Sequence, residues 1–93
     1  MAVSYFIPAF LRGFTESKSR VELDVAPVTV DEALGALCDI YPGVRDRVLT
    51  EQGVVRQHVN VFVGDESIRY TGGLDTPIPD GAEIFIVPAV SGG

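Results

Sequence analysis

A chain of 93 residues has room for one domain and one hydrophobic core. Thirteen acidic against seven basic residues give a net charge of −6, which opposes binding to nucleic acid phosphates, and no stretch approaches the length of a membrane span. The acidic charge is compatible with steering toward a basic protein partner or with solubility alone. Because Cys38 is the single cysteine and no basic residue precedes Arg12, we expect a cytoplasmic protein without disulfides or a signal peptide.

The N-terminal quarter of the sequence predicts a β-hairpin. Val3 to Phe10 reads as a strand, in which Pro8 indicates a sheet edge or a bulge. Polar residues and a glycine over 11–18 indicate a turn. Ser19 to Val25 then alternates charged residues with the apolar side chains of Val21, Leu23 and Val25, which is typical of a half-buried strand.

Thr29 to Tyr41 is the clearest predicted helix. Thr29 and Glu32 have the spacing of a capping box, in which each side chain binds a free backbone N–H of the first turn. The apolar face follows at helical spacing, through Val30, Ala33, Leu34, Leu37, Cys38 and Tyr41. Pro42-Gly43 is expected to end the helix, and Cys38 is expected to be a small buried residue rather than a reactive thiol.

The second half of the sequence predicts short strands separated by turns. A short helical turn is expected around Val44 to Leu49 in an otherwise polar segment. Strands are expected at Val59 to Val63, Ser67 to Tyr70 and Glu83 to Ala89, with turns at 64–66, 71–73 and 79–81. This order predicts an α+β domain over residues 1–90, with a mixed sheet of four or five strands wrapped on one main helix, followed by a flexible tail over residues 91–93.

The last strand predicts a second apolar face on the sheet. Ile84 and Ile86 point to one side, and Phe85 and Val87 point to the other, where a single helix provides no cover. Phe62 and Ile68 are expected on the same side as Phe85 and Val87. An exposed apolar patch of this kind is typical of a partner-docking surface, and the alternative is a central strand covered by loops.

The sequence offers few groups for catalysis. His58 is the only histidine and opens a strand, no Cys/His cluster has zinc spacing, and Asp75 and Asp80 sit in turn-like segments. Gly72-Gly73 lacks the rest of a phosphate-binding loop and is expected to form a hairpin bend. We therefore expect no catalytic residue, no metal and no bound cofactor.

The reactive group predicted for this chain is instead the carboxylate of Gly93. Ser91-Gly92-Gly93 follows the last strand, and two glycines form a neck narrow enough to enter the active site of another enzyme. A carboxylate is a poor electrophile, so a partner must activate it with ATP, as an acyl-adenylate. Attack by sulfide then gives a thiocarboxylate, which is a soft nucleophile.

Four segments together resemble the ubiquitin-like β-grasp sulfur carriers of the ThiS/MoaD family. They are the Thr29-capped helix ending at Tyr41-Pro42, the strand Val59–Val63, the stretch Asp80–Ile84 and the ending Val87–Gly93. Gly72–Thr76 and Pro88–Gly93 look most like the CysO-type carriers, although Ser91 stands where such tails often carry alanine.

The resemblance implies a monomeric carrier rather than an enzyme. An E1-like adenylyltransferase would activate Gly93, and the thiocarboxylate would pass its sulfur to a cysteine synthase-like or another biosynthetic enzyme. Three alternatives stay open at this point: the small subunit of molybdopterin synthase, a ubiquitin-like protein modifier, and an interaction domain with an inert tail.

Overall fold

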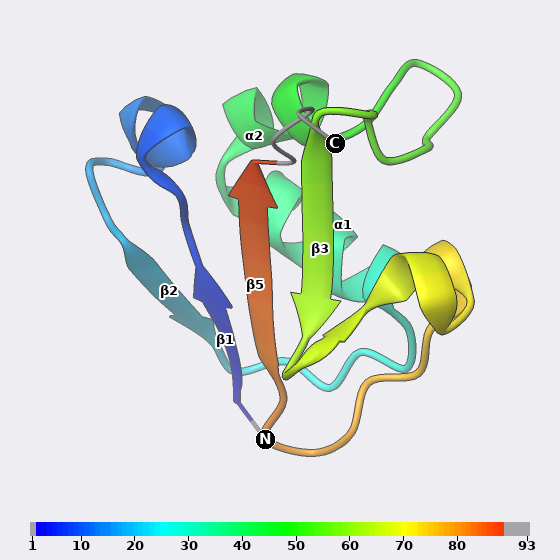
Figure 1. The fold of residues 1–93 in the computed structure, drawn as a ribbon. Helices are drawn as coiled ribbons and strands as arrows, with labels where there is room; N and C mark the ends of the chain where they lie inside the picture. Colours follow the sequence, from blue (N-terminus) through cyan, green and yellow to red (C-terminus); the bar gives the residue numbers. More distant parts are fainter. Residues whose placement is uncertain (1, 89–93) are drawn as a thin grey trace.

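One five-stranded mixed sheet organises the chain, whose computed structural model describes residues 2–88 (Figure 1). The strands lie in the order β2 (Arg20–Leu23), β1 (Val3–Phe6), β5 (Glu83–Pro88), β3 (Val59–Val63) and β4 (Glu66–Ser67). β1 and β5 run parallel in the middle of the sheet, and the other neighbours are antiparallel. The predicted α+β architecture, with a mixed sheet on one main helix, is confirmed.

The main helix, α1 (Val30–Ile40), begins at the predicted cap. The Glu32 N–H donates to Thr29 Oγ1 at 3.3 Å, and the Glu32 carboxylate accepts from the Val28 N–H at 3.2 Å. The carboxylate thus reaches one residue further back than a standard capping box. The predicted apolar stripe is buried against the sheet, with Val30, Ala33, Leu34, Leu37 and Cys38 as its members within the helix.

A second helix, α2 (Pro42–Val48), follows almost directly. The prediction that Pro42-Gly43 ends the first helix is confirmed, since α1 ends at Ile40, and the helical turn expected around Val44 to Leu49 is a longer helix that begins at Pro42. The two roles are compatible because proline lacks the N–H that the first helical turn leaves unpaired. Gly43 has a packing role here, since a Cβ at this position would lie 2.7 Å from Phe14 Cδ1.

The first strand is shorter than predicted. β1 ends at Phe6, and Ala9–Phe14 forms a 3-10 helix, η1, instead of continuing the strand to Phe10. Pro8 is extended, and its carbonyl accepts from the Leu11 N–H at 3.0 Å, which starts the helical turn. Because β1 lies inside the sheet, the expectation that Pro8 marks an edge or a bulge is wrong.

The segment after β4 also differs from the expected strand and bend. β4 is two residues long, and Ile68–Tyr70 and Gly73–Asp75 form 3-10 helices, η2 and η3. Gly72 and Gly73 have φ angles of 120° and 62°. They lie at the junction of η2 and η3, with Gly73 as the first residue of η3, rather than in a bend between two strands. Thr76 secures the connection, because its hydroxyl donates to the Gly73 carbonyl at 2.7 Å.

The hydrophobic core lies between the inner face of the sheet and the two helices. Tyr5, Ile84 and Ile86 project from the central strands into this core and are almost fully buried. The Tyr5 hydroxyl crosses to α1 and donates to the Ala33 carbonyl at 2.7 Å. The opposite face of the sheet is not covered by either α-helix (Figure 1).

Candidate functional site

The predicted sulfur-bearing residue lies outside the described residues. Gly93, with Gly92 and Ser91 before it, follows Pro88 by at most five positions, and Pro88 is the last residue of β5. The structure therefore fixes the end of the sheet from which this tail starts. The role of these three residues stays a prediction, as does the boundary between domain and tail after residue 90.

A row of aromatic side chains crosses the uncovered face of the sheet. Strand register places Phe6 opposite Phe85, and Phe85 opposite Phe62. The Phe6 and Phe85 rings stack with centroids 4.4 Å apart and an interplanar angle of 10°. All three side chains are half-buried. Part of their apolar surface is therefore accessible to a partner, on the face of the sheet that neither α-helix covers.

Two of the predicted docking residues, Phe62 and Phe85, therefore lie together, and Val87 shares their face. Ile84 and Ile86 between them point into the core, as the alternation predicted. The sequence reasoning missed Phe6, although the same alternation gives the signal. Because Tyr5 is buried, its neighbour in β1 must point outward.

Ile68 does not belong to this face, and its predicted docking role is wrong. Strand pairing places Ser67 opposite Phe62, so Ser67 shares the outer face and the next residue turns inward. The chain then enters η2, which holds Ile68 in the core at 3% exposure. Ile68 is a packing residue.

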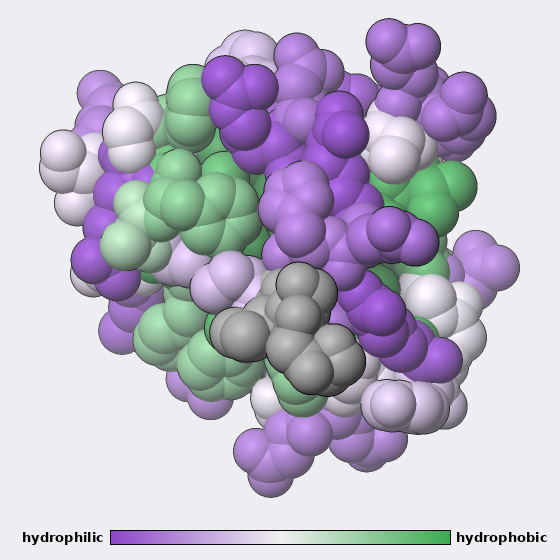
Figure 2. Space-filling view, turned by 45° about the horizontal axis from the view of Figure 1, so that its top comes forward, coloured by the Kyte–Doolittle hydropathy of each residue, from purple (hydrophilic) through white to green (hydrophobic). Residues whose placement is uncertain are grey.

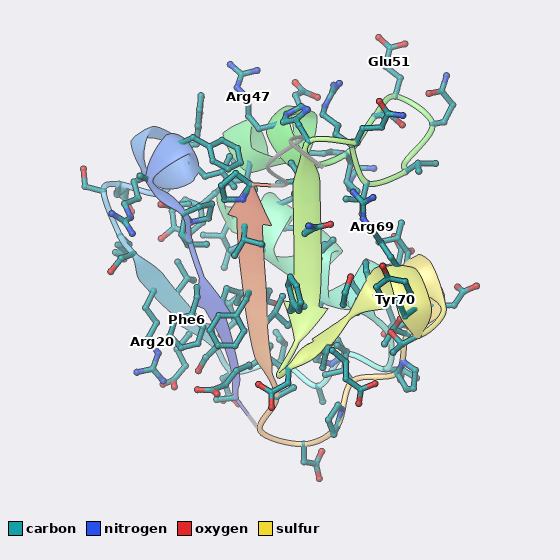
Figure 3. All side chains as sticks on the ribbon, viewed as in Figure 1. Phe6, Arg20, Arg47, Glu51, Arg69 and Tyr70 are labelled. Atoms are coloured by element: carbon teal, nitrogen blue, oxygen red, sulfur yellow. The ribbon has the colours of Figure 1, made fainter. Side chains whose placement is uncertain are left out.

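Polar groups border the aromatic row at the β2 edge. The Arg20 guanidinium lies 5.6 Å from the centre of the Phe6 ring and forms an ion pair with Glu22 at 3.5 Å (Figure 3). The same guanidinium donates to Ser4 Oγ at 3.1 Å. This arrangement holds the Arg20 guanidinium over the Phe6 end of the aromatic row, so that the apolar surface ends there.

A buried acceptor lies at the other end of the face. Asn60 is opposite Val87 in the β3–β5 pairing, and its Oδ1 atom is buried without a hydrogen-bond partner among the described residues. A buried unpaired amide oxygen costs free energy unless a donor reaches it. Asn60 is thus a polar position next to predicted docking residues that the sequence reasoning did not identify.

An apolar hollow adjoins the end of β5. It has a volume of about 470 Å³ and is lined by Pro8, Ala9, Phe10, His58 and Pro88. Phe10 is 40% exposed and contributes apolar surface to this hollow. Figure 2, tilted so that the top of Figure 1 comes forward, shows hydrophobic and hydrophilic surfaces side by side on this end of the molecule.

Cys38 lies in the core, as predicted. Burial is the main cause that raises the pKa of its thiol, and Arg45 opposes the shift only in part. A raised pKa leaves little thiolate at neutral pH, so Cys38 is a poor nucleophile. Within residues 2–88, no three His, Cys, Asp or Glu side chains are grouped to hold a metal ion, and no helix is long and apolar enough to cross a membrane.

Comparison with known proteins identifies the family. The ThiS family matches residues 6–93 of this chain. The chain belongs to the ThiS family. The sulfur carrier protein CysO of Mycobacterium tuberculosis is 35% identical over 95 residues, which cover the whole of both chains.

Solved structures of similar proteins share the fold of this ThiS-family chain. In the Amycolatopsis orientalis BexX/CysO complex, one chain superposes with a TM-score of 0.86 at 33% identity, covering 98% of this chain and 99% of that one. SAMP1 of Haloferax volcanii superposes with a TM-score of 0.80 at 30% identity over the full length of both chains. The predicted ubiquitin-like β-grasp fold is confirmed by these likenesses.

Proposed function

We propose that this ThiS-family chain is a sulfur carrier whose sulfur is held as a thiocarboxylate on Gly93. The observation that carries the proposal is the position of β5. This strand contributes Phe85 and Val87 to the uncovered apolar face, and it ends five residues before Gly93. One enzyme can therefore bind the uncovered apolar face of the sheet while the tail reaches its active site.

The chemistry requires two steps that a partner catalyses. A carboxylate oxygen of Gly93 attacks the α-phosphorus of ATP, which forms the acyl-adenylate and releases pyrophosphate. Sulfide supplied by the partner system then attacks the acyl carbon, AMP leaves, and loss of the S–H proton gives the thiocarboxylate. The resulting thiocarboxylate is delivered at high local concentration to an enzyme that makes cysteine or another sulfur-containing metabolite.

The outer face supplies the docking energy in this proposal. Phe6, Phe62 and Phe85 lie side by side on three neighbouring strands, so they form one continuous contact surface rather than scattered residues. Aromatic residues are enriched among those that dominate binding energy at interfaces.

The chain is a substrate of its partners in this scheme and uses no residue of its own as a catalyst. A single buried cysteine with a raised pKa supports this assignment. ATP belongs to the activating enzyme. Ligation of Gly93 to lysines of other proteins is a second candidate, because a small archaeal modifier protein superposes on the full length of the chain.

The test is an intact-mass measurement on the protein purified from its native cells with sulfur available. A species heavier by the difference between one sulfur and one oxygen, located in the Gly93 peptide, is the expected result. A variant with one residue added after Gly93, shown to be uncleaved, should give no such species. Normal adenylation of that extended variant would refute the proposal, and lysine-linked adducts without any thiocarboxylate would favour the modifier.

A further inference from the structure

The charged side chains divide between the two ends of the sheet. The end where β5 finishes consists of η1 with the turn after it, the end of α1, α2 and the loop over 49–58, and we call it the tail pole. It carries six basic and four acidic side chains: Arg12, Lys18, Arg45, Arg47, Arg56 and Arg69, with Glu16, Asp39, Asp46 and Glu51. Arg69 belongs here because its guanidinium donates to the Val59 carbonyl, and Val59 pairs with Pro88.

The opposite end, which we call the acidic pole, carries eight carboxylates and neither Lys nor Arg. They are Asp24, Asp31, Glu32, Asp65, Glu66, Asp75, Asp80 and Glu83. The remaining charged side chains, Arg20 and Glu22, form an ion pair with each other. The formal balance is therefore +2 at the tail pole and −8 at the acidic pole, within a net charge of −6.

Contacts at the tail pole hold several arginines without neutralising them. Arg12 donates to the Ile7 carbonyl at 3.2 Å, Arg56 to the Asp46 carbonyl at 2.8 Å, and Arg69 to two backbone carbonyls at 3.1 and 3.2 Å. Each guanidinium has five N–H donors, so these contacts leave donors and the full positive charge available.

Two labelled residues show how the tail pole faces the solvent. The Arg47 guanidinium lies 4.7 Å from the centre of the Phe14 ring, and both Arg47 and Glu51 project outward at the top of Figure 3. A cation over an aromatic ring keeps its charge. The tail pole thus carries two more basic than acidic side chains, at the same end of the molecule as the apolar hollow beside the end of β5.

The two poles act separately on a partner. The molecule measures 36 × 31 × 24 Å, whereas charges in solution are screened over about 8 Å at physiological salt. A protein that approaches the tail pole therefore meets mainly its local positive charge. The net charge of −6 is therefore a poor guide to the electrostatic field that a partner meets at the tail pole.

We propose that the tail pole docks on an acidic rim around the slot by which the E1-like activating enzyme admits the C-terminus. This inference rests on the proposed function, because it assigns the partner for the tail. The same rim repels the acidic pole, so the carrier is oriented tail-first before the apolar face makes contact. The overall acidity had suggested a basic partner, and the division of charge reverses this expectation for the surface that carries the tail.

The test compares two substitutions that change the net charge equally at opposite poles. Glu51→Lys adds two positive charges to the tail pole, and Asp80→Lys adds two to the acidic pole, both at exposed loop positions. The assay is ATP–pyrophosphate exchange by the purified E1-like enzyme of the source organism, with the KM for the carrier measured at low and high NaCl. Glu51→Lys should lower KM about two- to fivefold at low salt, because one exposed ion pair contributes about 0.2–1 kcal/mol. Asp80→Lys, at the far pole, should change KM by a smaller factor.

A substitution that replaces a positive charge by a negative one at the tail pole should change KM in the opposite direction. Arg45→Glu, also at an exposed position, should raise KM by about three- to tenfold at low salt, and high salt should remove most of this difference. Equal effects of Glu51→Lys and Asp80→Lys, or a lower KM for Arg45→Glu, would overturn the inference while leaving the proposed function intact. Absence of exchange with the wild-type protein would refute the proposed function, and the inference would fall with it.

Discussion

Removal of one buried hydroxyl, in Tyr5→Phe, should give a stability difference that changes sign with pH. Tyr5 is fully buried in the central strand β1, and its hydroxyl donates to the Ala33 carbonyl of α1 at 2.7 Å. Phenylalanine keeps the ring and its packing. The substitution therefore removes a hydrogen bond and an ionisable group, and little else.

The two losses have different pH dependence. At neutral pH the missing hydrogen bond should destabilise the variant by about 0.5–1.5 kcal/mol. Burial, with a smaller contribution from Cys38, raises the pKa of Tyr5 in the folded protein to about 12. The pKa of Tyr5 in the unfolded chain is about 10. Above this pH the tyrosine is deprotonated in the unfolded state, so folding requires the uptake of a proton and becomes less favourable. The wild-type protein thus loses about 2 kcal/mol of stability by pH 12, and Tyr5→Phe does not.

The assay is urea unfolding of both proteins between pH 7 and pH 12, followed by circular dichroism. All other titrating groups are shared, so the difference between the two free energies of unfolding isolates Tyr5. The curves should cross near pH 11, where the ionisation cost is about 1 kcal/mol and equals the hydrogen-bond term. A constant difference across this range would show that the Tyr5 hydroxyl is not held in a dry environment, and would refute the reasoning.

Three further substitutions test packing and the outer face by urea unfolding. Gly35→Ala should raise the free energy of unfolding by about 0.5–1 kcal/mol, because the added methyl meets no atom within 4 Å and alanine favours the helix; a loss would mean that α1 packs more tightly there. Ile68→Ala should lower the free energy of unfolding by about 2–5 kcal/mol, as expected for a core residue, whereas an unchanged value would show that Ile68 is not buried in the core. Asn60→Val should raise it by about 1 kcal/mol, because it removes a buried unpaired acceptor, and a decrease would reveal a partner for that oxygen.

The regular elements were predictable from the sequence because their signals are local. The cap at Thr29 and the helical spacing that follows define α1, and the alternation over Val59–Val63 gives β3 with the same bounds as the structure. The mixed sheet on one main helix follows from the order of these elements. The inward and outward sides of β5 were also assigned correctly, since a strand alternates strictly.

The errors fall where one residue type permits two local structures. Pro8 predicts a strand edge or a bulge, but it precedes a helical turn, whereas Pro42 follows the end of α1, as predicted, and also begins α2. The short 3-10 helices over 68–75 have no periodic signal, so Ile68 was placed on the wrong face. The two charge poles required the fold, because they gather residues from segments far apart in the sequence.

The parallel pairing of β1 with β5 has a consequence for how the protein is made. β5 is synthesised last, yet it lies between β1 and β3, so the sheet cannot close until the chain has been translated through Pro88. Contacts between such distant segments form slowly compared with local ones. A chain that stops before β5 therefore lacks the aromatic row of Phe6, Phe85 and Phe62. Under the proposed function, the docking surface is therefore complete only once the strand that leads to Gly93 has been made.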